Sequence, residues 1–99
     1  MNKHISYKLD QLFVEDVAVS EITSNLRTPF YVYSRTSIKD NFDRFTRSLK
    51  GLDNIICYSV KANSNLSVLQ TIAKLRGGAD VVSLGEYHRA LRAGIDQKR

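Results

Sequence analysis

Apolar residues recur at intervals of three and four in three stretches of the chain, which is the pattern of amphipathic helices. Their positions are Ile38, Phe42, Phe45 and Leu49 in the first stretch, Leu66, Leu69, Ile72 and Ala73 in the second, and Tyr87, Ala90 and Leu91 in the third. Each stretch follows a serine, threonine or asparagine and ends at a glycine, as helices commonly do. The spacing therefore predicts three helices, and the first should bury its phenylalanine face.

Three other stretches have the composition of β-strands. Residues 28–33 are aromatic and β-branched, with Pro29 at the start, where a missing N–H is tolerated. Residues 55–60 are an apolar run that suits a strand covered on both faces, and residues 79–83 form a second short run. Residues 14–19 fit either a short strand or a loop. The alternation of strands and helices predicts an α/β fold with parallel strands and crossover helices.

Composition narrows the class of protein. A chain of 99 residues is enough for one small domain, and 42% hydrophobic and 25% charged residues are ordinary for a globular protein. No apolar run approaches the roughly 20 residues that span a bilayer, and residues 1–6 have no signal-peptide core. The single cysteine, Cys57, cannot form an internal disulfide. We therefore expect a cytoplasmic protein with no membrane partner.

The net charge of +5 raises the question of a nucleic-acid partner. The cations on the first predicted helix are interleaved with Asp40 and Asp43, which is typical of a solvated helix face. No finger or ribonucleoprotein motif accompanies them. We therefore expect no nucleic-acid partner.

Lys61 directly follows the predicted strand at residues 55–60. Parallel α/β proteins place their active groups at the carboxyl ends of their strands. Alternation along the strand places Lys61 on the same face as Cys57 and Ser59. Desolvation there would favour the neutral, nucleophilic form of the amine, as Schiff-base chemistry requires. From this context alone, however, a lysine that extends into solvent is the simpler interpretation.

The residues around Lys61 reverse that preference. Residues 58–63, Tyr-Ser-Val-Lys-Ala-Asn, resemble the signature of the pyridoxal-phosphate-dependent ornithine, diaminopimelate and arginine decarboxylase family. Two further blocks resemble the same family: Gly-Ala-Asp-Val-Val-Ser-Leu-Gly-Glu at residues 78–86 and Arg-Ala-Leu-Arg-Ala-Gly at residues 89–94. Residues 28–33 resemble the opening strand of the members that act on diaminopimelate. The chain departs from the pattern at Ser59, Arg76 and Leu84, none of which is a group that does chemistry.

The resemblance implies a fold and a cofactor. The fold is a partial (β/α)8 TIM-type barrel that binds pyridoxal 5'-phosphate, with about two strand–helix units in residues 37–99. Residues 1–36 would be an N-terminal arm that contributes one strand to a separate β-domain. In the family, the lysine that matches Lys61 carries the cofactor, and the aspartate that matches Asp80 lies near it. Asp80 could equally be a strand-start carboxylate that only fixes local geometry.

Three further residues have structural interpretations that we prefer. Glu86 stands three residues after Ser83, as in a capping box, although it also matches a family glutamate near the site. His88 should lie exposed on a helix. Cys57 should be a core residue rather than a catalytic one.

The resemblance also implies an activity, the decarboxylation of meso-diaminopimelate to L-lysine by a full-length homodimeric enzyme. Arginine or ornithine as substrate, and a non-catalytic remnant, remain alternatives. The family's ring-stacking histidine, glycine-rich phosphate loop and acidic partner of the pyridine nitrogen have no match in these residues. We therefore expect the 99-residue chain to be inactive by itself.

Overall fold

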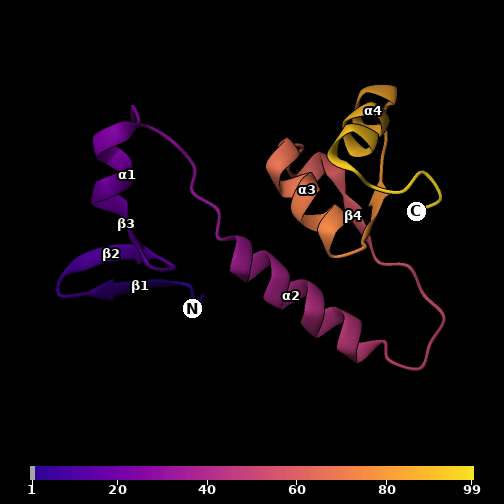
Figure 1. Ribbon diagram of the computed structural model, residues 1–99, viewed down its shortest axis with the longest axis horizontal. Helices are drawn as coiled ribbons and strands as arrows, with labels where there is room; N and C mark the ends of the chain where they lie inside the picture. The colour runs from indigo at the N-terminus through magenta and orange to yellow at the C-terminus, as the bar shows by residue number, and fades with distance from the viewer. Residues whose placement is uncertain (1) are drawn as a thin grey trace. The chain divides into compact units, whose positions relative to one another are not determined.

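The computed structural model describes residues 2–99, which divide into two units at Asp40. Figure 1 shows the elements along the chain. The first unit holds the strands β1 (Ile5–Lys8), β2 (Gln11–Val14) and β3 (Val17–Ala18) and the helix α1 (Val19–Asn25). Helix α2 (Arg35–Ser48) crosses the boundary between the units. The second unit continues with β4 (Cys57–Ser59), the 3-10 turn η1 (Val60–Ala62), α3 (Leu66–Lys74), β5 (Gly78–Asp80) and α4 (Leu84–Ala93).

The first unit is built on a small antiparallel sheet of strand order β1-β2-β3. Leu9 and Asp10 join β1 to β2, and both have positive φ angles, of 49° and 62°. A two-residue turn with positive φ at both positions matches the right-handed twist of the strands that it connects. Neither residue is a glycine, which is why the turn has no strong sequence signal. We expected residues 1–36 to contribute one strand, but the described part of this segment contains three strands, β1, β2 and β3.

The strand predicted at residues 28–33 is absent, and these residues form an irregular segment that leads into α2. Tyr31 is 88% exposed, and it stacks on Tyr33 with ring centroids 6.4 Å apart. A strand is stabilised by pairing with a neighbour, and no described strand pairs with this segment. Strand-like composition alone therefore did not produce a strand here.

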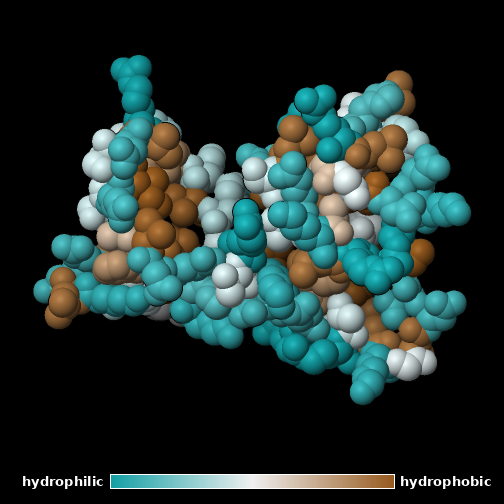
Figure 2. All heavy atoms as spheres, viewed as in Figure 1, coloured by the Kyte–Doolittle hydropathy of each residue, from teal (hydrophilic) through white to brown (hydrophobic). Residues whose placement is uncertain are grey.

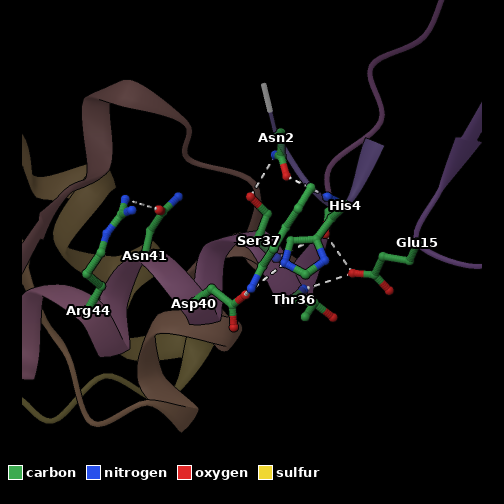
Figure 3. Close-up of polar contacts among 10 residues, drawn as sticks. Asn2, His4, Glu15, Thr36, Ser37, Asp40, Asn41 and Arg44 are labelled. Atoms are coloured by element: carbon green, nitrogen blue, oxygen red, sulfur yellow. Dashed lines mark hydrogen bonds and ion pairs between the residues drawn. The ribbon is translucent and has the colours of Figure 1, made fainter. Parts of the chain in front are cut away.

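Glu15 holds the start of helix α2 in the first unit (Figure 3). Its Oε1 atom accepts hydrogen bonds from Ser34 Oγ at 2.7 Å and from the Thr36 N–H at 2.9 Å. These bonds lower the pKa of Glu15 from 4.5 to about 2. Ser34 Oγ accepts in turn from the Ser37 N–H at 3.0 Å. Of the two residues that could cap this helix, Ser34 and Thr36, Ser34 is therefore the cap, with Glu15 as an additional partner that lies 19 residues away.

Asp40 makes a second polar contact with the first residues of the chain. Lys3 Nζ lies 2.9 Å and His4 Nε2 lies 2.8 Å from Asp40 Oδ2. The hydrogen bond from Lys3, and then that from His4, lower the pKa of Asp40 to about 2. Asn2 Nδ2 also donates to Ser37 Oγ at 2.8 Å (Figure 3). The residues that lead into β1 are thus held against the first turns of α2 by polar contacts.

Helix α2 forms as predicted, but the expectation that it buries its phenylalanine face is wrong. No residue of α2 is buried, and Phe45 is 54% exposed. Phe42 lies against Gly77, where an added Cβ would come within 2.9 Å of the ring. The described residues provide too little surface to cover the rest of the face.

The second unit contains the two strand–helix repeats predicted from the sequence. Strands β4 and β5 pair in parallel, with Tyr58 opposite Ala79 and Ser59 opposite Asp80. Asn65 caps α3 by accepting the Ser67 N–H at 2.8 Å. The cap of α4 is Ser83, whose hydroxyl accepts the N–H of the third helical residue at 3.1 Å. The mixed α/β class is therefore confirmed.

The core of the second unit is small. Val60 and Leu69 are fully buried, and Ala93 of α4 packs with them. The prediction that residues 55–60 are covered on both faces is wrong, since Ile55 and Cys57 are exposed. A two-stranded sheet has two outer edges, each with backbone groups that a further strand could pair with. Figure 2 shows apolar side chains at the surface of both units, and no described helix is long and apolar enough to cross a membrane.

We predict that Leu69→Ala lowers the free energy of unfolding by about 2–5 kcal/mol, because the surrounding core fills the resulting cavity only in part. Leu52 is 65% exposed and provides the matched control. Leu52→Ala should change stability by less than about 0.5 kcal/mol. Urea denaturation followed by circular dichroism measures both effects. Equal losses for the two variants would contradict this assignment of the core.

We also predict a pH-dependent release of Glu15 from the start of α2. Because its pKa in the folded chain, about 2, lies below 4.5, the stabilisation is complete above pH 4.5 and is lost as the pH falls through about 2. The Thr36 amide resonance, followed by NMR against pH, should report this transition. Glu15→Gln should abolish it, whereas Glu21→Gln on α1 should leave it in place. A Thr36 transition that survives Glu15→Gln would contradict the assignment.

Candidate functional site

Lys61 lies in the 3-10 turn η1, directly after the carboxyl end of β4. The neighbouring residue Val60 is fully buried, whereas the Lys61 side chain is exposed. Within residues 2–99 the Lys61 ammonium group has no hydrogen-bond or ion-pair partner. Lys61 thus lies at the end of the strand, as the sequence predicted. The side chain remains exposed to water, however, because no described residue covers it.

The backbone around Lys61 is held by several contacts. The Asn63 N–H donates to the Val60 carbonyl at 3.2 Å, which closes the 3-10 turn. Asn63 Oδ1 accepts the Asn65 N–H at 3.0 Å, and Asn65 caps the following helix. The segment between β4 and α3 is therefore a defined turn with a free primary amine at its surface.

Asp80 ends strand β5, directly opposite Ser59 of β4. Ser59 Oγ donates a hydrogen bond to Asp80 Oδ2 at 3.0 Å. Asp80 is exposed, so its carboxylate is accessible beyond this one bond. Because parallel strands end at the same edge of a sheet, the pairing brings the ends of the Lys61 and Asp80 segments to one edge of the unit.

Ser59 is the residue that sequence reasoning did not assign to the site. It stood out only as a departure from the family pattern, and the bond to Asp80 depends on the strand register. The register itself was not predictable, because two short strands offer little pattern to align.

The other three singled-out residues are placed as follows. Glu86 Oε1 accepts the Val82 N–H at 3.1 Å, so the prediction of a capping carboxylate is confirmed. In an ideal capping box the carboxylate would accept the N–H of the cap residue itself, Ser83, which is one residue later. His88 is exposed on α4 as predicted, in edge contact with Tyr87. The prediction that Cys57 is a core residue is wrong, since Cys57 is exposed, and its Sγ lies 3.9 Å from the Arg99 carbonyl oxygen.

A cavity of about 340 Å³ lies in the first unit. Its lining residues are Val14, Glu15, Val17, Ile22, Val32, Tyr33, Arg35 and Thr36. None of the predicted site residues lines it, so we do not assign the cofactor site there. Among the described residues there is also no cluster of His, Cys, Asp and Glu that could hold a metal ion.

The sequence of this chain is similar to known pyridoxal-dependent decarboxylases. The family model of the pyridoxal-dependent decarboxylases, for their pyridoxal-binding domain, matches residues 35–99. Diaminopimelate decarboxylase from Pseudomonas aeruginosa is 46% identical over 91 residues, which are 92% of this chain and 22% of that protein. The same enzyme from Vibrio cholerae is 42% identical over 97 residues, or 97% and 23% of the two chains.

The structure of this chain is also similar to that of a solved member of the same family. Diaminopimelate decarboxylase from Helicobacter pylori, in complex with L-lysine, matches with a TM-score of 0.74 and 48% identity, covering 78% of this chain and 20% of that one. This chain therefore spans about a fifth of the length of the relatives that it matches.

Proposed function

The chain belongs to the pyridoxal-dependent decarboxylase family, and on that premise we propose that it supplies the cofactor lysine of an enzyme that decarboxylates meso-diaminopimelate to L-lysine. One observation carries the proposal: Lys61 stands as a free amine on a defined turn at the carboxyl end of a parallel strand. The names of the relatives, all diaminopimelate decarboxylases, support the choice of substrate over ornithine or arginine.

We infer that the second unit is part of a larger (β/α)8 barrel. The two strand–helix repeats support this inference, as does the family match that begins at residue 35, close to the expected boundary between residues 36 and 37. A further contact supports it. Gly78 bonds to the Ile56 carbonyl on the side of β4, and the next N–H, of Ala79, donates to the Arg99 carbonyl at 2.9 Å. Residue 99 thus occupies the edge of β5 where a third strand would pair.

The residues present fit pyridoxal 5'-phosphate as a cofactor. Lys61 offers the primary amine to which the cofactor's aldehyde carbon attaches, and Asp80 offers a carboxylate at the end of the neighbouring strand. When bound, this cofactor supplies an electron sink for the bond that breaks at the substrate's α-carbon. In our proposal Lys61 holds the cofactor covalently and Asp80 binds at its site, with its carboxylate oriented by Ser59.

The substrate and the assembly are part of the proposal. We infer that a small amino acid is the ligand, supported by the L-lysine complex of the relative from Helicobacter pylori. We further expect the whole enzyme to be a homodimer, as the family resemblance implies. The exposure of Lys61 and Asp80 is consistent with a site whose remaining walls come from elsewhere in a larger protein.

We predict that Lys61 reacts selectively with pyridoxal 5'-phosphate. After borohydride reduction and peptide mass mapping, Lys61 should carry more label than any other lysine of the chain, because its turn is fixed and its amine is free. Lys74 provides the matched control, since it is also exposed and lies on α3. Lys61→Ala should remove most of the specific label, and Lys74→Ala should leave it. Label spread evenly over all lysines would contradict the proposed function.

We also predict that the 99-residue chain by itself has negligible decarboxylase activity. Its described residues leave Lys61 and Asp80 open to water, so the electrostatic and positional effects of an enclosed site are missing. Release of carbon dioxide from meso-diaminopimelate should equal that of free pyridoxal 5'-phosphate. Turnover above that level, lost on Lys61→Ala, would show that this chain already forms a working site.

A further inference from the structure

We propose that Tyr58 and Arg89 are positioning residues that hold the turn of Lys61 in one conformation. The inference rests on the proposed function for its purpose, since it concerns how Lys61 is presented to a cofactor. Its physical content is independent of any cofactor: two side chains, from two different elements, bond to the backbone carbonyls of the second and third residues after Lys61.

Tyr58 reaches the turn from strand β4. Its hydroxyl donates to the Asn63 carbonyl at 3.1 Å, across five residues of chain that include Lys61. The ring is half-buried and packs against the core cluster of Val60 and Leu69. The strand thus holds the hydroxyl by packing, and the hydroxyl holds the far side of the turn.

Arg89 reaches the same segment from helix α4. Its Nε donates to the Ser64 carbonyl at 2.9 Å, a contact between residues that lie 25 positions apart. Helix α4 also packs on η1, where Ala93 and Val60 belong to the same core cluster, so the helix and the turn meet through both apolar and polar contacts. A bond from a charged donor to a carbonyl is stronger than one between neutral groups.

The two bonds act on consecutive carbonyls, of Asn63 and Ser64, while buried Val60 fixes the other side of the turn. The backbone of Lys61 therefore lies between fixed points, although its side chain is free. Presenting a reactive group from a rigid backbone reduces the conformational entropy lost when it reacts. Neither side chain needs to touch the cofactor for this effect.

The test uses two matched pairs of variants and one conservative variant, Arg89→Lys. Tyr58→Phe and Arg89→Gln each remove one donor to the turn. Tyr31→Phe alters a tyrosine that is almost fully exposed, and Arg92→Gln removes the same charge from the same helix. Amide hydrogen exchange at residues 61–64 measures the order of the turn, and the share of borohydride-trapped label on Lys61 measures its presentation.

We expect exchange at residues 61–64 to accelerate by about three- to ten-fold in Tyr58→Phe and Arg89→Gln, the effect of one lost hydrogen bond. The share of label on Lys61 should fall by a similar factor, while the melting transition stays close to that of the parent chain. Arg89→Lys, which keeps a charged donor, should restore part of both readouts. Tyr31→Phe and Arg92→Gln should change neither.

The outcomes separate this inference from the proposed function. Unchanged exchange in Tyr58→Phe and Arg89→Gln would overturn the positioning role, even if Lys61 is labelled selectively. So would acceleration spread equally over the second unit, because it would indicate general destabilisation. If exchange accelerates only at the turn but Lys61 is never labelled selectively, the positioning contacts stand and the proposed function fails.

Discussion

The parallel pairing of β4 with β5 is the contact on which the rest of the second unit depends. Its register places Ser59 opposite Asp80, so both strands end at the same edge. Val60 then enters the core, and the next residue, Lys61, turns out to the surface. A shift of one residue would reverse these directions, because side chains alternate along a strand. The position of the amine and the identity of the core residue are therefore set by the same pairing.

Much of the second unit could be predicted from the sequence because its signals are local. Asn65 and Ser83 cap helices that begin immediately after them, and Gly94 ends α4 with a positive φ of 98°. The first unit was less predictable because its contacts are not local. The turn at Leu9 and Asp10 places Leu9, a residue with no turn preference, at positive φ, and Glu15 bonds to a helix start that lies 19 residues later. The strand predicted at residues 28–33 failed for lack of a partner to pair with.

The sequence suggested which residues form the site, but it did not indicate their surroundings in the described residues. Lys61 and Asp80 came from family resemblance, because a lysine after an apolar run is by itself an ordinary feature. The expected burial of Lys61, Cys57 and the Phe45 face requires neighbours that the described residues do not provide. The relatives are about five times as long, so the faces left open here are consistent with a piece of a larger fold. Ser59 acquired its contact only through the register, which no local pattern encodes.

The most direct test of this account is the register of β4 and β5 in solution, read from nuclear Overhauser contacts between backbone protons. The account predicts contacts between Tyr58 and Ala79 and between Ser59 and Asp80, with Val60 in contact with Leu69. Contacts that pair Ser59 with Ala79 instead would indicate a register shifted by one residue, with Lys61 directed to the opposite face. That result would contradict both the site and the contacts proposed to hold it.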